Sequence, residues 1–529
     1  MVLFIILVLA IVLAIATGSG FISLPGLREG HLPPGPLALP FIGNVHSLPR
    51  LGMKFKLSQW AKEYGPIFSL KAFHGNIIVL NSAYLASELF IKRSAYYSNR
   101  PSLYVLDKLI FNGDHMMFMN ADGRWKLRRK LYYQLMSPSR CDNDHSSMIE
   151  AEIVQTLKDL FVEPSALMNH PGRLSNSIIM SLVFGIRTPR HDTNHFDELR
   201  QIMTELASLG DIGATPPIDL LPFLKFLPER LWCNWKARAK RLREKMLGLY
   251  HPLVERVIER RKQHIASQTS FLDAVLNQQE KLNLTRNELD VMCGNLIEGG
   301  TDTISTFILT FFQAMANHPS LQKEAQEQID LVIGDGLMPS WKDYNLLPRT
   351  VMIVKEVLRW RPPASNGFAH AASKDDTIDG MIIPKGSTII LNIWDIHHDP
   401  VRYQHPEEFT PSRFQWQTRL ASSYANCRDH RDRDHFAYGA GRRLCPGIHL
   451  AERILFLFVV KVLWAYTIHM DSDTGGNPVP VNVDPRTGYH QGAINECLPF
   501  KVRFEFRSPG RQQIVFAEAE KVKPETFRM

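Results

Sequence analysis

One short stretch decides the fold of this chain, and it reads Phe436-Ala437-Tyr438-Gly439-Ala440-Gly441-Arg442-Arg443-Leu444-Cys445-Pro446-Gly447. Its single cysteine, Cys445, lies among glycines and arginines directly before an apolar stretch that predicts a helix. Glycines allow a backbone to approach a flat ligand closely. A thiolate needs positive surroundings and amide donors, and the N-terminus of the following helix supplies both. Arg443 can neutralise an acidic group of the same ligand, so the segment has the features that a haem-thiolate site requires.

At every fixed position this segment matches the signature Phe-x-x-Gly-x-Gly-x-Arg-x-Cys-x-Gly, and the chain resembles the cytochrome P-450 monooxygenases. Two alternatives are a glycine loop around a buried cysteine and a phosphate-binding loop. The second lacks a third glycine at the dinucleotide spacing and a strand leading into it. The resemblance extends from Pro33 to about Arg507. It implies a haem b cofactor whose iron takes an axial thiolate from Cys445, with Phe436 and Arg443 also binding the cofactor.

Two further motifs support the resemblance. Glu356-Val357-Leu358-Arg359 is similar to the family's Glu-x-x-Arg motif, and at i, i+3 both charged side chains share one helix face. Alone, such a pair is most often a solvated surface ion pair. Here Arg361-Pro362-Pro363 and Pro411-Ser412-Arg413-Phe414 follow, as in the family. The resemblance therefore implies that Glu356, Arg359 and Arg413 form a buried network with a structural role.

Basic residues that could meet the acidic groups of a haem occur in two places. Trp125 and Arg129 resemble the family's Trp-x-x-x-Arg helix, and their i, i+4 spacing lets both point at a haem propionate. His370 falls where the family has a basic residue near the other propionate, and the alternative is a plain surface histidine. The remaining basic residues of the first segment are expected on the exposed face of its helix: Lys126, Arg128 and Lys130.

A pair of glycines lies midway along a predicted helix over 285–317, in the run Glu298-Gly299-Gly300-Thr301-Asp302-Thr303. The helix opens with a capping box of Thr285 and Glu288. Adjacent glycines cost a helix about 1 kcal/mol each relative to alanine, so a kink without function is one reading. The run also resembles the family's Gly-Gly-x-Asp-Thr, which implies that Asp302 and Thr303 are the catalytic acid–alcohol pair delivering protons to dioxygen. Glu298 is left as a solvated residue or a polar substrate contact.

The N-terminus predicts a membrane anchor. No charged residue occurs before Arg28, and a helix over 2–24 is long enough to cross a hydrocarbon core of about 30 Å. A cleaved signal peptide is the alternative, but the chain lacks a basic start. The first charges follow the apolar run, which places the catalytic domain in the cytosol. We expect a single-pass protein of the endoplasmic reticulum membrane, with a proline-rich hinge over 32–40.

Composition excludes several classes of protein. Of the 529 residues, 45% are hydrophobic and 22% charged, which argues against disorder, collagen and coiled coil. The net charge of +8 is modest for this length, and no dense basic run with interleaved aromatics predicts nucleic-acid binding. The six cysteines are widely spread without Cys-x-x-Cys, so a disulfide framework or zinc site is not expected.

The predicted fold is mainly α-helical with small β-sheets (α+β), as the resemblance to the cytochrome P-450 fold implies, in one domain over 41–507. A loose polar tail is expected over 508–529. The segment 415–435 is longer and more charged than usual for the family, and 428–435 predicts a solvated loop. Strands are predicted over 67–70, 77–80, 388–391 and 502–506. Helices are predicted over 59–64, 83–91, 125–135, 231–263, 285–317, 321–329, 349–360 and 450–464.

The resemblance implies a haem-thiolate monooxygenase that inserts one oxygen atom of O2 into a hydrophobic small molecule. The chain resembles the fungal microsomal members of the family that oxidise secondary metabolites. Electrons would come from NADPH through a separate reductase of the NADPH–cytochrome P-450 reductase type, and a cytochrome b-type donor is also compatible. Two alternatives stay open: a haem-thiolate isomerase or dehydratase on the same fold, and a non-enzymatic haem-binding sensor. The segments expected around the substrate are mostly apolar: 104–118, the loop near Asp219, 297–303, 364–369 and 492–494.

Overall fold

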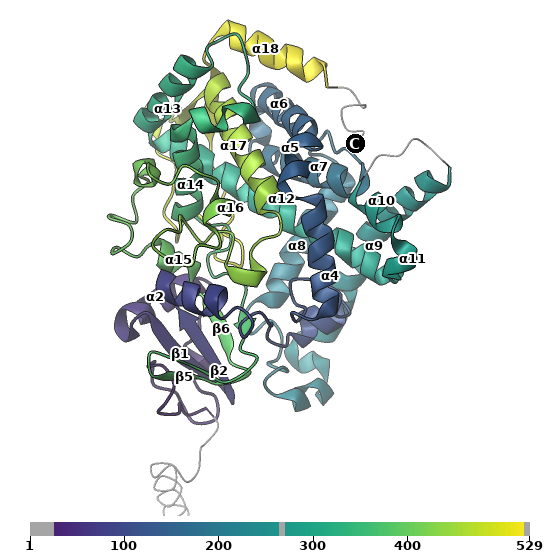
Figure 1. Cartoon of the computed structure of the whole chain (residues 1–529), viewed down its shortest axis with the longest axis vertical. Helices are drawn as coiled ribbons and strands as arrows, with labels where there is room; N and C mark the ends of the chain where they lie inside the picture. The colour runs from purple at the N-terminus through teal and green to yellow at the C-terminus, as the bar shows by residue number, and fades with distance from the viewer. Residues whose placement is uncertain (1–25, 264–269, 523–529) are drawn as a thin grey trace, which may run out of the picture.

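The computed structural model describes residues 26–263 and 270–522. Its largest sheet has four strands in the order β1-β2-β6-β3 and lies with α2 at one end of the molecule (Figure 1). β1 (Ile67–Ala72) and β2 (Gly75–Leu80) form an antiparallel hairpin, β6 (Thr388–Leu391) runs parallel to β2, and β3 (His370–Ala371) is antiparallel to β6. This sheet therefore joins segments that are more than 300 positions apart in the chain.

Two smaller sheets complete the β structure of the described residues. β4 (Asp376–Ile378) pairs with β5 (Met381–Ile383). β7 (Tyr466–Ser472) pairs with β8 (Pro478–Val479) and with β9 (Val502–Phe506). The predicted strands over 388–391 and 502–506 are confirmed as β6 and β9, and those over 67–70 and 77–80 are confirmed within the longer β1 and β2.

Helices make up most of the molecule, so the prediction of a mainly α-helical fold with small sheets is confirmed. Short π-helical segments also occur at Ser87–Lys92 and Tyr104–Ile110. The α-helices are α2 (Met53–Tyr64), α3 (Ala83–Ala86), α4 (Gly123–Leu135), α5 (Pro138–Asn143), α6 (Ser146–Val162), α7 (His170–Phe184), α8 (Asn194–Gly210), α9 (Trp235–Lys262), α10 (Phe271–Leu276), α11 (Gln279–Leu282), α12 (Arg286–Asn317), α13 (Pro319–Val332), α14 (Pro348–Trp360), α15 (Ile393–His397), α16 (Ala421–Tyr424), α17 (Ile448–Ala465) and α18 (Pro509–Glu520).

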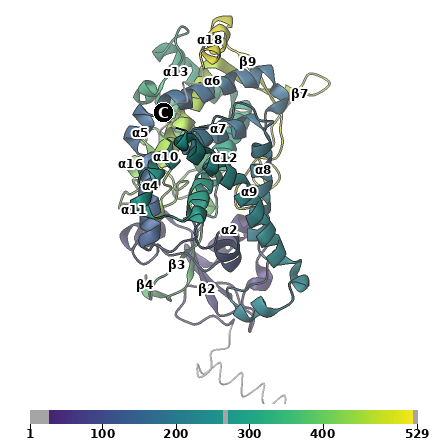
Figure 2. The same cartoon turned by 90° about the vertical axis from the view of Figure 1, so that its right-hand side faces the viewer.

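The long helix α12 forms the centre of the helical region, packed against α7 and α9 (Figure 2). Its predicted capping box is present, because Thr285 accepts from the Glu288 amide while Glu288 accepts from the Thr285 amide. Two glycines permit the close packing. A Cβ added at Gly294 would lie 2.3 Å from the Tyr250 ring, and one at Gly300 would lie 2.6 Å from Ile179. Space for neighbouring helices thus explains part of the glycine content of α12.

Some predictions about the fold are wrong. The loose tail expected after Ser508 instead forms α18, whose Val515 side chain is buried and whose Arg511 pairs with Asp330. No helix is predicted where the structure has α6, α7 and α8, and these three helices contribute much of the core. Every residue of α7 is buried, so the polar residues in its sequence do not mark a solvent-exposed face.

The predicted anchor over 2–24 lies outside the described residues. Within the part of the chain that the structure describes, no helix combines the length and apolarity that a membrane span needs. The hinge over 32–40 packs on β1, where Ser69 donates its hydroxyl proton to the Pro33 carbonyl (2.6 Å) and its amide to the Pro34 carbonyl (2.7 Å). A Cβ at Gly35 would lie 2.0 Å from the Ser69 oxygen, so this contact needs glycine.

Candidate haem-thiolate active site

The cysteine loop is a tight turn that only glycine allows at two positions. Gly439 and Gly441 adopt the left-handed region at φ 76° and 62°. A Cβ at Gly441 would lie 1.7 Å from the Phe90 carbonyl oxygen. The Cys445 amide donates to the Tyr438 carbonyl (2.9 Å), and α17 begins three residues after the cysteine. The loop therefore presents Cys445 just before a helix N-terminus, as its sequence predicts.

Charged residues before the loop hold it in place, contrary to the prediction that 428–435 is a solvated loop. Arg433 is 1% exposed and donates to the carbonyls of Ala425, His435 and Gly439. Lys355 of α14 forms a buried ion pair with Asp434 (2.6 Å). The expectation fails for Arg433 and Asp434 because their side chains bond to other segments of the chain. Residues 431 and 432 are exposed, as predicted.

The Glu-x-x-Arg network is confirmed as buried. Glu356 and Arg359 are fully buried and joined by two hydrogen bonds of 2.7 and 2.8 Å, and Arg413 adds a third at 3.1 Å. Nδ1 of His397 donates to the backbone carbonyl of Arg359. Nε2 of the same ring accepts a hydrogen bond from the Phe436 amide (2.8 Å). The network therefore supports the first residue of the cysteine loop through His397.

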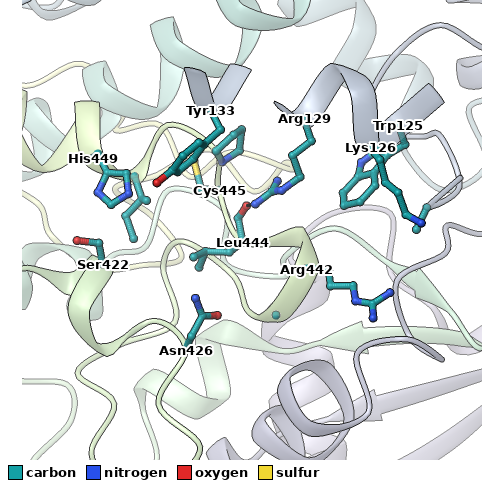
Figure 3. Close-up of a pocket in the computed structure, with 14 residues that line it drawn as sticks. Trp125, Lys126, Arg129, Tyr133, Ser422, Asn426, Arg442, Leu444, Cys445 and His449 are labelled. Atoms are coloured by element: carbon teal, nitrogen blue, oxygen red, sulfur yellow. Dashed lines mark hydrogen bonds between the residues drawn. The ribbon is translucent and has the colours of Figure 1, made fainter. Parts of the chain in front are cut away.

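Two opposing effects act on the thiol of Cys445. Burial raises its pKa, while the Gly447 amide and the Arg129 guanidinium lower it. Arg129 reaches from α4 to the Leu444 carbonyl beside the sulfur (Figure 3). A buried thiol with amide and cationic support becomes a thiolate when a metal ion takes its proton's place. These surroundings fit a Cys445 thiolate that would hold a haem iron.

Two arginines beside the loop lack an anionic partner among the described residues. Arg443 stacks on Trp125 at 4.3 Å and donates to the carbonyls of Ser98, Met116 and Met119. Arg100 donates to the carbonyls of Met117, Phe368 and Ala369. Burial and their mutual repulsion lower the pKa of Arg443 to about 9, and burial lowers that of Arg100 to about 10. Two enclosed guanidinium groups without carboxylates fit a dianionic ligand, and the two propionates of haem meet that need.

His370 lies in the same region and is not a surface histidine. Its Nδ1 donates to the Tyr97 carbonyl (2.6 Å), and its ring lies 4.3 Å from that of Phe90. Burial, with Arg100 and Arg443 nearby, holds its pKa well below the usual range. Because Nδ1 carries the one proton of a neutral His370 ring, its Nε2 is left as a hydrogen-bond acceptor. Arg100 had no motif to mark it, and only its backbone-carbonyl partners reveal it.

The prediction that Arg128 lies on an exposed basic face is wrong. Arg128 is 1% exposed and pairs with Asp114 (3.2 Å) and Glu288 (2.8 Å). Lys126 and Lys130 are exposed as expected. The difference arises because α4 packs against the capping box of α12, which provides a carboxylate for a buried guanidinium.

One glycine of the pair in α12, Gly299, faces open space, whereas Gly300 packs against Ile179. Gly299 is exposed, and Asp302 and Thr303 are partly exposed, although the following two turns of the helix are buried. A Cβ at Gly299 would meet nothing within 4 Å, and the Thr303 hydroxyl donates to the Gly299 carbonyl (2.9 Å). Burial and the nearby Glu496 raise the pKa of Asp302 to about 7. A carboxyl group with this pKa can hold and release a proton at neutral pH.

A cavity of about 620 Å³ opens on the cysteine side, lined by residues of α4 and of the loop (Figure 3). Lys126 and Arg442 lie at its rim, Arg129 and Cys445 lie further in, and His449 lies on the opposite side. None of its fourteen lining residues is an aspartate or glutamate. The cavity thus offers positive charge next to the predicted iron ligand.

Comparison with known proteins agrees with this site. The sequence pattern of the cytochrome P450 family matches residues 33–484. The chain is 57% identical to the cytochrome P450 monooxygenase anuE of Penicillium roqueforti over 88% of this chain and 95% of that protein. It is 42% identical to macC of Penicillium terrestre (93% of each chain) and to yanC of Aspergillus niger (94% of each).

The chain therefore belongs to the cytochrome P450 family. Within that family it is a P450 monooxygenase, as these fungal relatives are. The resemblance drawn from the cysteine loop is thereby confirmed, and the family implies a haem-thiolate iron cofactor.

Proposed function

We propose that this enzyme inserts one oxygen atom of O2 into a hydrophobic small molecule of fungal secondary metabolism, with electrons from NADPH through a separate reductase. The observation that carries the proposal is the open stretch of α12 where Asp302, whose pKa is raised to about 7, adjoins Thr303. The haem, when bound to Cys445, supplies the activation of dioxygen. The bound haem would be oriented by five residues: Arg443, Arg100, Arg129, His370 and Trp125.

The protein's own contribution is to place substrate and protons. Met116, Met117 and Phe118 are partly exposed on the loop before α4, and Phe368 is 41% exposed before β3. Such apolar side chains suit a hydrophobic substrate. Asp302 holds a proton and Thr303 positions a hydroxyl one residue further along α12. An isomerase or dehydratase would not need this pair, which favours the monooxygenase.

The experiment for this proposal is turnover with a fungal reductase, NADPH and candidate metabolites under ¹⁸O2. Under ¹⁸O2 we expect a product that carries one ¹⁸O atom. With ordinary O2 in ¹⁸O-labelled water we expect a product without ¹⁸O. A product formed without O2 and NADPH would identify an isomerase or dehydratase, and haem binding without any turnover would favour a sensor.

We also propose that an acidic electron donor docks over the cavity at Cys445. Lys126→Glu and Arg442→Glu should each raise the reductase concentration needed for half-maximal reduction about ten-fold at low salt, because they reverse steering charges at the rim. Lys130→Glu is the matched control, since Lys130 is exposed on the same helix but does not line the cavity. Stopped-flow reduction across a salt series measures this. An equal effect of all three variants would show that overall charge alone matters.

For localisation we propose a single-pass anchor over 2–24 in the endoplasmic reticulum membrane, supplemented by apolar side chains of the domain. Leu37 and Phe41 are 88% and 60% exposed in and beside the hinge, and Phe226 and Leu231 are 89% and 69% exposed between α8 and α9. Both groups lie at the end of the molecule that carries the large sheet (Figure 1). Apolar side chains of this kind insert into a membrane interface.

Deleting residues 1–27 should move most of the protein from the membrane to the soluble fraction without loss of haem, since every predicted cofactor-binding residue follows the deletion. Phe226→Ser combined with Leu231→Ser should release the remainder. The measurement is the distribution between pellet and supernatant after high-salt washing, with haem absorbance followed in both. Full retention of the doubly changed, truncated protein in the pellet would contradict a single anchor.

A further inference from the structure

A buried hydrogen-bonded cluster joins three segments directly before the glycine pair of α12. Glu298 accepts a bond from Tyr250 of α9 through Oε1 (2.6 Å) and from Nε2 of His115 through Oε2 (2.9 Å). The side chains of His115 and Glu298 are 4% and 7% exposed. Glu298 is therefore neither solvated nor free to bind substrate, which answers the question that its sequence position left open.

The hydrogen bonds define the donors and the acceptor of this cluster. Nδ1 of His115 accepts the Met117 amide (3.2 Å), so the ring carries its proton on Nε2, which donates to Glu298. Tyr250 keeps its hydroxyl proton and donates it to Glu298, because burial and Glu298 raise its pKa well above its usual value. Glu298 therefore accepts a hydrogen bond on each of its two side-chain oxygens, which is the arrangement that suits a carboxylate.

This carboxylate lies one helical turn before Asp302, and residues at i, i+4 are neighbours on a helix surface. Asp302 also faces Glu496 of the 492–497 loop and Arg200 of α8. Burial is the largest cause of the raised pKa of Asp302, Glu496 and then Glu298 raise that pKa further, and Arg200 lowers it. Near Glu298 the other ionisable groups are His115, Tyr250 and the buried Tyr132 of α4.

The same cluster also holds the loop that binds the unpaired arginines. α12 fixes this loop at two points, through Glu298 to His115 and through Asn295, which accepts the Met116 amide (2.9 Å). The carbonyls of Met116 and Met117 in turn accept bonds from Arg443 and Arg100. Of the two residues that attach the loop to α12, Glu298 has an ionisable side chain and Asn295 does not. Variants of the two residues therefore distinguish an effect of charge from an effect of loop attachment.

We propose that Glu298 is a positioning residue for proton delivery: its carboxylate, held by His115 and Tyr250 one helical turn before Asp302, adds to burial and to Glu496 in favouring the protonated form of Asp302 that donates. The inference rests on the proposed function, in which Asp302 supplies a proton. It assigns to Glu298 an action through Asp302, not contact with substrate or cofactor.

The first test needs no substrate. Infrared difference spectra of the holoenzyme, titrated with pH, report the C=O stretch of a buried protonated carboxyl group, and its loss in Asp302→Asn assigns the band. In Glu298→Gln the midpoint of this band should fall by about half a pH unit, because one of several charges acting on Asp302 is removed. Glu298→Met serves if the first variant does not fold, since it presents no amide donor to Tyr250 and His115.

Asn295→Ala is the matched control for loop attachment and should leave the midpoint unchanged. Tyr250→Phe removes a donor and keeps the charge, so it too should give no downward shift. An unchanged midpoint in Glu298→Gln, an equal shift in Asn295→Ala, or no Asp302 band in the parent would overturn the inference.

A second readout separates this inference from the proposed function. In coupled turnover, the pH above which product per NADPH falls should be lower in Glu298→Gln than in the parent, by the same shift. A parent that incorporates no oxygen from O2 refutes the proposed function, whereas the infrared result stands independently. Oxygen incorporation with identical pH profiles in the two proteins refutes the role of Glu298 alone.

Discussion

Cys445→Ala abolishes the red-shifted Soret band that we expect from the reduced, carbon monoxide-bound protein, and the loss should be complete. The band would report thiolate ligation of the haem, and no other residue of the loop offers a thiolate. Alanine fits the site sterically, so haem lost from the variant would itself indicate that the sulfur holds the iron. Absorbance spectra of dithionite-reduced protein with and without carbon monoxide measure this.

Cys427→Ala is the matched control, because Cys427 precedes the same loop and is only partly exposed, yet does not line the cavity at Cys445. It should keep the full band. The buried Cys141 lies on α5 and does not line the cavity at Cys445, so it is not placed to substitute. A normal thiolate spectrum in Cys445→Ala would contradict the assignment of the ligand.

Thr303→Ala should keep haem, thiolate spectrum and substrate binding but lose control over protons. Alanine is the better helix former, so α12 is not weakened. Removing a positioned proton-transfer group typically costs about 10²–10⁴-fold in the step it serves, and we expect about 10², because water can partly replace the hydroxyl. Electrons then leave as hydrogen peroxide and less product forms. NADPH consumption, peroxide and product measured together give the coupling.

Thr301→Ala provides the control two residues earlier on α12. Thr301 is 2% exposed, and its carbonyl accepts a bond from Ser175 of α7, so it lies on the side away from the open stretch. Its variant should couple as the parent does. Equal coupling in Thr303→Ala and the parent would reduce Thr303 to an ordinary helix residue and would favour the isomerase alternative.

The family and the parts of the site that are local in sequence could be predicted without the structure. The cysteine loop, the capping box of α12 and the helix that carries Glu356 and Arg359 each depend on residues within a few positions of one another. Spacing on a turn or a helix face defines such units, so the sequence determined the place of Cys445 and the pairing of Glu356 with Arg359.

Partners distant in the chain were decided only by the tertiary structure. His115 and Glu298 are 183 positions apart, Arg128 and Glu288 are 160 apart, and Lys355 and Asp434 are 79 apart. From local sequence, a polar residue on a helix face is predicted to be solvated. Only the packing of the helices shows whether a polar partner from a distant segment lies beside it. The burial of Arg128, the α18 helix and the cluster of Glu298 with His115 and Tyr250 arise in this way. Desolvation makes each buried polar group depend on a partner that local spacing does not specify.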